Sequence, residues 1–184
     1  ERGGPTPPKA ALANEFDKQK LTGKGVVIGV IDSGIDWRHE DFIRPDGTSR
    51  ILAIWDLFDS SYQTSSGSIG SKPPVYFERE AKWLGTVYTN EQINAALNGT
   101  GTVRSADKQG HGTAVAGTAA ANGRATANGI PAGTYSGVAP DADLIIVKAM
   151  DCSYFSSFAQ LTSEWITDYA KSLGKPIVVN MSFG

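Results

Sequence analysis

The length, composition and charge of the chain exclude several classes of protein. It has 184 residues, of which 40% are hydrophobic and 20% charged, and these values exclude a disordered polar tail. Seventeen basic and nineteen acidic side chains give a net charge of −2 at pH 7, so we expect neither nucleic acid nor an anionic membrane as a partner. The single cysteine, Cys152, excludes an intrachain disulfide and a multi-cysteine zinc site, and the apolar runs are too short to span a bilayer.

The N-terminal half of the chain contains two predicted helices and two predicted strands. Apolar residues at rough helical spacing predict a short surface helix from Lys9 to Leu21. The run from Val26 to Ile31 is apolar and rich in β-branched residues, which is typical of a strand buried on both faces of a parallel sheet. Ile51 to Trp55 predicts a further strand, and Glu91 to Leu97 predicts a short helix.

The C-terminal part of the chain predicts a strand, a helix and a second strand. The runs Leu144 to Val147 and Ile177 to Val179 repeat the pattern of a buried strand. Between them, apolar residues from Phe158 to Leu173 recur at three- and four-residue steps, which predicts an amphipathic helix that ends at Gly174. A strand, a helix and a strand of these lengths form a right-handed βαβ unit, so the predicted fold class is α/β.

Asp32 is the first candidate for chemistry. It stands at the C-terminal end of the first buried strand and is followed by Ser33 and Gly34. Ligands and reactive groups gather at the carboxyl ends of the strands in open parallel sheets. The simpler alternative is an aspartate that caps a helix or a turn. Two unrelated classes of enzyme use an apolar strand followed by Asp-Ser-Gly, so this motif does not decide between them.

His111 is the second candidate. Glycine and alanine dominate the residues that follow it up to Ala121, which predicts a helix that can approach the sheet closely. His111 would lie at the N-terminus of this helix, where the helix dipole disfavours the imidazolium. A neutral imidazole there could accept a proton as a general base. The alternative is a histidine that caps a turn.

Four segments of the chain resemble segments of the subtilisin-like serine peptidases, and they follow one another in the same order as in that family. Gly25 to Asp41 resembles the aspartate segment of that family, and Gly110 to Gly123 resembles its histidine segment. Gly137 to Leu144, with the following Val147-Lys148, resembles the next loop and strand, and Val178 to Gly184 resembles the strand that flanks the substrate. The resemblance implies a three-layer, doubly wound and mainly parallel sheet, incomplete on its C-terminal side.

The resemblance also implies roles for individual residues. Asp32 would orient the imidazole of His111, which would take a proton from a serine that attacks a peptide carbonyl. The backbone of Ser182, Phe183 and Gly184 would pair with an extended polypeptide substrate as an added strand. Ala114 stands where many members carry a second histidine, a difference that should not affect the proton relay.

The resemblance further predicts that the chain is only part of a catalytic domain. The segment that carries the serine in the family lies beyond the strand that ends at Gly184, so we expect this chain to supply aspartate and histidine and to be inactive alone. Residues 1–21 would be an N-terminal extension with the surface helix, and residues 22–184 would be the N-terminal part of the domain, with an insertion at about 43–108. The expected partner is the C-terminal remainder that carries the serine, or a second copy bound at the exposed strand edge.

Other functions and ligands stay open at this point. An aspartic peptidase would use Asp32-Ser33-Gly34 but needs two such aspartates on an all-β fold, and a pseudopeptidase would keep the fold only to bind a partner. Asp41 corresponds to a calcium ligand in some members, but Asn122 to Ser136 contains no acidic residue, so we expect no cofactor. His39 and the four tryptophans are expected to be structural. Family habit points to a secreted or periplasmic bacterial protein.

Overall fold

The structure is a computed structural model that describes residues 21–63, 69–126, 129–150 and 155–182. Almost all of the helix predicted from Lys9 to Leu21 lies outside these residues, as do Cys152, Phe183 and Gly184. No helix in the described ranges combines the length and the apolar character needed to cross a membrane.

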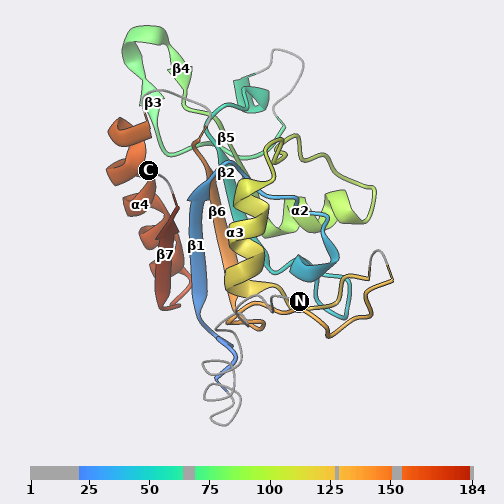
Figure 1. Cartoon of the computed structure of the whole chain (residues 1–184). Helices are drawn as coiled ribbons and strands as arrows, with labels where there is room; N and C mark the ends of the chain where they lie inside the picture. Colours follow the sequence, from blue (N-terminus) through green and yellow to red (C-terminus); the bar gives the residue numbers. More distant parts are fainter. Residues whose placement is uncertain (1–20, 64–68, 127–128, 151–154, 183–184) are drawn as a thin grey trace, which may run out of the picture.

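A five-stranded sheet forms the centre of the molecule, in the order β5-β2-β6-β1-β7 (Figure 1). The strands pair in parallel, except that β5 runs antiparallel to β2 at one edge. The four predicted strands are confirmed, each within one or two residues of the expected ends. The strands are β1 (Val27–Asp32), β2 (Ile51–Asp56), β5 (Thr86–Thr89), β6 (Asp143–Lys148) and β7 (Ile177–Met181).

Helices cover both faces of the sheet, which makes three layers (Figure 1). On one face lie α2 (Asn90–Leu97) and α3 (His111–Ala120), which pack against apolar side chains such as Val30 and Ile146. On the other face α4 (Phe155–Ser172) packs through Ile166 and Ala170. These findings confirm the three-layer α/β fold and the helices predicted at α2, α3 and α4, although α4 begins three residues before Phe158.

The connection from β6 through α4 to β7 passes over β1. The predicted strand–helix–strand order is correct, but β6 and β7 do not pair with each other, because β1 lies between them and pairs with both. Asp32 at the end of β1 therefore lies between two parallel neighbours, at the carboxyl edge of the sheet.

Strand β7 is at the edge of the sheet and is less buried than its sequence predicts. Ile177 and Val179 pack toward α4, whereas Val178, on the opposite face, is 65% exposed. In the described residues the run is therefore not buried on both faces, whereas the expected exposure of an apolar strand at the sheet edge is found. The reason is that α3 covers the neighbouring strands and no described segment covers Val178.

The smaller elements occur in the part of the sequence between β1 and α2. The segment from 43 to 108, predicted to hold an insertion, includes β2, β5 and α2, so much of it belongs to the central sheet and to the helices that cover it.

Trp37 and Trp55 are buried in the two apolar clusters, as expected for structural tryptophans. The remaining elements are the hairpin of β3 (Tyr76–Phe77) and β4 (Lys82–Trp83) and three short 3-10 helices, η1 (Glu40–Phe42), η2 (Ser61–Gln63) and η3 (Glu78–Glu80).

Candidate active site

Asp32 lies where the buried core meets the surface. It is the last residue of β1, and none of its surface is exposed. Its Oδ1 accepts a hydrogen bond from the backbone N–H of Ser33 at 2.6 Å and lies 2.7 Å from His111 Nδ1. Its Oδ2 is buried and has no hydrogen-bond partner among the described residues. The structure thus brings together the two residues that the sequence predicts to act as a pair.

The N-terminus of α3 reaches this carboxylate because glycine lines the contact. Gly110 precedes the helix with φ of 79°, in the left-handed region that favours glycine. A Cβ atom on Gly112 would lie 3.1 Å from Asp32 Cβ and would collide with the carbonyl oxygen of Gly34. The predicted close approach of a small-residue helix to the sheet is therefore confirmed, and Gly112 makes it sterically feasible.

The neighbouring carboxylates shift the pKa of His111 in the direction opposite to that expected from the helix dipole. The hydrogen bond and the charge of Asp32 raise the pKa of His111 above its ordinary value of 6.5, and the charge of Asp107 adds to this effect. The carboxylate at 2.7 Å favours the imidazolium, whereas the dipole of the ten-residue helix disfavours it. The His111 side chain is 49% exposed, so the ring can meet groups that approach from outside. The contact with Asp32 occupies Nδ1 and leaves Nε2 for such groups.

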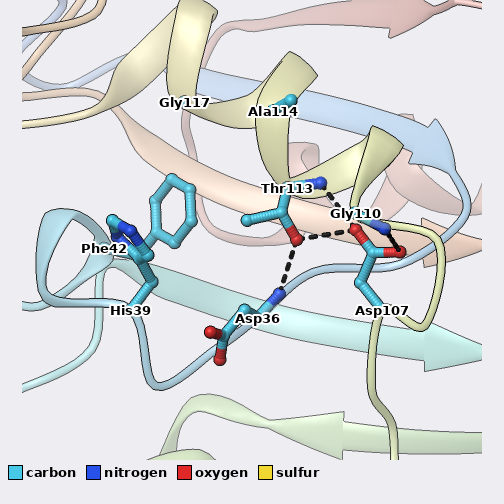
Figure 2. Close-up of a pocket in the computed structure, with 8 residues that line it drawn as sticks. All are labelled: Asp36, His39, Phe42, Asp107, Gly110, Thr113, Ala114 and Gly117. Carbon is cyan, nitrogen blue, oxygen red and sulfur yellow. Dashed lines mark hydrogen bonds between the residues drawn. The ribbon is translucent and has the colours of Figure 1, made fainter.

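Two residues near the pair, Asp107 and Thr113, were missed by the sequence reasoning. Asp107 accepts hydrogen bonds from Ser33 Oγ and from the backbone and hydroxyl of Thr113. The available signal was an aspartate four residues before His111, at the start of a predicted helix, where a carboxylate is favourable. Asp107 and Thr113 both line a hollow of about 440 Å³ beside α3. Figure 2 shows the two side chains facing each other.

The residues expected to bind substrate are only partly described. Ser182 follows β7, and its Oγ donates a hydrogen bond to Asn180 Oδ1 at 2.8 Å. Phe183 and Gly184 lie outside the described residues. The strand-like pairing with substrate therefore stays a prediction.

Asp41 and His39 have structural contacts. Asp41 Oδ1 accepts a hydrogen bond from the backbone of Ala125 at 2.8 Å, which links η1 to the loop after α3. His39 caps η1 by accepting a hydrogen bond from the backbone of Asp41, and its ring packs against Phe42. Over the described ranges, no three His, Cys, Asp or Glu side chains come together in a group that could hold a metal ion.

The sequence profile of the Subtilase family, Peptidase_S8, matches residues 23–184. The chain belongs to the subtilase family. It is 30% identical over 178 residues to the subtilisin of Bacillus sp. (strain TA39), an alignment that covers 96% of this chain and 31% of that protein. It is 35% identical to the PII-type proteinase of Lactococcus lactis subsp. cremoris over 98% of this chain and 9% of that protein.

Comparison with solved structures shows that the fold is shared with a protease of known structure. The subtilase chain superposes on the Clostridium perfringens CspB protease with a TM-score of 0.69 and 28% identity, over 94% of this chain and 32% of that chain. It therefore spans about a third or less of the length of these relatives. A subtilase serine protease domain with an α/β fold is incompatible with the aspartic-peptidase alternative, which requires an all-β fold.

Proposed function

We propose that Asp32 and His111 are two members of an Asp-His-Ser triad in a serine endopeptidase that hydrolyses peptide bonds of polypeptide substrates. The observation that carries this proposal is the 2.7 Å contact between Asp32 Oδ1 and His111 Nδ1 at the carboxyl edge of the sheet. Membership of the subtilase family supports it. The whole protein would carry the activity, because this chain corresponds to only part of its relatives.

In this mechanism Asp32 fixes the tautomer of His111, so that the proton resides on Nδ1 and the lone pair on Nε2. His111 Nε2 takes the proton of the serine hydroxyl as the serine oxygen bonds to the peptide carbonyl carbon. The resulting imidazolium, stabilised by the Asp32 carboxylate, gives that proton to the departing amine as the C–N bond breaks. Water then hydrolyses the acyl-enzyme, with His111 again acting first as base and then as acid.

The serine would come from the C-terminal remainder of the domain. Ser33 is beside the pair, but its hydroxyl already donates to Asp107 and accepts from the backbone of Gly112. The Ser182 hydroxyl is bonded to Asn180. These contacts support a nucleophile supplied by a further segment, and we expect the 184-residue chain to be inactive without it. That remainder would also cover the exposed face of β7.

The full-length protein tests the proposal. It should cleave an unfolded polypeptide and be labelled by a serine-directed fluorophosphonate. Asp32→Ala should lower kcat by about 10⁴-fold, the order seen when the aspartate of such a triad is lost, because the imidazole is no longer oriented. Asp168→Ala is the matched control, since Asp168 is an exposed aspartate on α4, and it should leave kcat unchanged.

Three results would contradict the proposal. Near-normal kcat in Asp32→Ala would remove Asp32 from the mechanism. Cleavage by the purified 184-residue chain alone would show that no downstream serine is needed. A full-length protein that is neither labelled nor active, and that has no nucleophile downstream, would favour the pseudopeptidase.

A further inference from the structure

We propose that Asp107 is a positioning residue, whose carboxylate holds the helix that carries His111 against the strand end that carries Asp32. The inference rests on the proposed function, because the placement of the pair matters for catalysis only if the pair transfers a proton. Asp107 has no contact with the reacting atoms in this view and would act through the residues that it binds.

On the helix side, Asp107 binds the first turn of α3. Its Oδ1 accepts a hydrogen bond from the backbone of Gly110 at 2.9 Å, and its Oδ2 accepts from the backbone and the hydroxyl of Thr113 at 2.9 and 2.6 Å. Figure 2 shows the carboxylate pointing at this turn. Gly110 occupies the N-cap position and has no side chain to cap the helix, so Asp107 satisfies these free N–H groups instead.

On the strand side, Asp107 binds the loop that follows Asp32. Ser33 Oγ donates a hydrogen bond to Asp107 Oδ1 at 2.9 Å. Ser33 Oγ also accepts a hydrogen bond from the backbone N–H of Gly112 at 2.8 Å. Thr113 completes a second bridge, because its Oγ1 accepts a hydrogen bond from the backbone of Asp36 at 2.9 Å. The residues directly after Asp32 and His111, namely Ser33 and Gly112, are thus joined through one hydroxyl whose direction Asp107 determines.

The loop that carries Asp107 is itself held in place. Trp37 Nε1 donates to the carbonyl oxygen of Ser105 at 3.0 Å, and Lys148 Nζ donates to that of Ala106 at 2.8 Å. Trp37 and Lys148 are both buried, so each of the two residues before Asp107 is bonded to the interior. A carboxylate on a fixed backbone can position its partners, whereas one on a free loop would follow them.

The charge of Asp107 adds an electrostatic effect. Partial burial opposes its ionisation, but the hydrogen bonds from Thr113, Gly110 and Ser33 outweigh burial and hold the pKa of Asp107 below its ordinary value. Asp107 is therefore ionised at neutral pH. Within the described part of the chain, Asp32 on β1 and Asp107 on the loop before α3 are the charged groups that raise the pKa of His111.

The test is Asp107→Asn in the full-length protein. The amide keeps the size of the side chain but loses the charge and one acceptor, so the Ser33 and Thr113 bridges cannot all form. We expect kcat to fall by about 10²-fold, the effect of a misplacement of the order of 1 Å, with little change in KM. The acid limb of kcat/KM should move to lower pH, because the pKa of His111 falls.

Asp46→Asn is the matched control. Asp46 also accepts hydrogen bonds from the backbone and the hydroxyl of a threonine, Thr48, at 2.9 and 2.6 Å, but it does not belong to the network around His111. Ser33→Ala keeps the Asp107 charge and removes the bridge to Gly112. It should therefore lower kcat, but it should move the acid limb of kcat/KM less than Asp107→Asn does. This second variant keeps the proposal testable if Asp107→Asn fails to fold.

The outcomes separate the two proposals. If the folded Asp107→Asn enzyme keeps the kcat and the acid limb of the Asp46→Asn control, Asp107 is only structural and the inference is overturned. If the full-length wild-type protein has no peptidase activity, the proposed function fails, and NMR titration of the His111 ring still tests the positioning. A lower His111 pKa in Ser33→Ala, which keeps the Asp107 charge but removes the bridge, than in Asp46→Asn would then support the inference, and equal values would overturn it.

Discussion

At the scale of single residues, the site combines a buried carboxylate with a half-exposed imidazole. Asp32 is fully buried, and its Oδ1 accepts a hydrogen bond from the Ser33 backbone and lies 2.7 Å from His111 Nδ1. His111 needs exposure on its other side to meet a substrate. The position at the end of β1, where the core ends, allows both the burial of Asp32 and the exposure of His111.

The raised pKa of His111 makes a pH dependence testable. In the full-length enzyme His111 must be neutral to accept a proton, so kcat/KM should rise with pH through the pKa of His111. Because the Asp32 hydrogen bond and charge raise that pKa, the midpoint of the acid limb should lie above pH 6.5. By the same linkage, the pair stabilises the fold most below pH 6.5 and loses that contribution as pH rises through the raised pKa.

A pH–rate profile of kcat/KM on a neutral peptide substrate checks this expectation. In the activity that remains in Asp32→Asn, the acid limb of kcat/KM should lie at lower pH, because the negative charge beside His111 is lost. A wild-type limb centred below pH 6.5 would mean that Asp32 does not act on His111 as its distance suggests.

At the scale of elements, the contact between α3 and β1 depends on the absence of side chains. Gly112 faces the loop after Asp32 so closely that a methyl group has no space, whereas a Cβ on Gly117 of the same helix would meet nothing within 4 Å. Both glycines lie in the same helix, so both pay the same entropic cost relative to alanine. Alanine substitutions at the two positions therefore distinguish the effect of steric packing from the effect of helix propensity.

Gly112→Ala should destabilise the protein and reduce its activity. Overpacking typically costs about 1 to 3 kcal/mol in the free energy of unfolding, and moving α3 away would also lengthen the contact between Asp32 and His111. Gly117→Ala should be neutral or stabilise by up to about 1 kcal/mol, because alanine favours the helix. Urea unfolding of both variants measures the difference, and equal stabilities would refute the close approach of α3 to β1.

At the scale of the whole molecule, one face of the sheet is left open at β7. Val178, on the face away from α4, is 65% exposed, and its strand pairs only with β1 among the described strands. Apolar side chains beside an unpaired strand edge favour association with another chain or segment. In the full-length protein we expect the remainder of the domain to cover the exposed side of β7.

The 184-residue chain alone should self-associate through β7. Val178→Lys should shift the purified chain toward monomer in analytical ultracentrifugation, because a lysine on an edge strand opposes pairing. Lys72→Ala is a suitable control, since it changes a surface residue remote from β7 in the sequence. A chain that is monomeric at every concentration, with or without the substitution, would contradict the expectation.

The sequence by itself determined the local elements and the two candidate residues. The apolar runs at β1, β6 and β7 and the spacing of apolar residues in α4 encode strands and a helix, because burial and periodicity are local properties. The segments around Asp32 and His111 identified the pair through their resemblance to the subtilisin-like peptidases. The tertiary structure decided the rest, because it depends on residues that meet only after folding: the placement of β1 between β6 and β7, the exposure of Val178, and the bridge from Asp107 through Ser33 to α3.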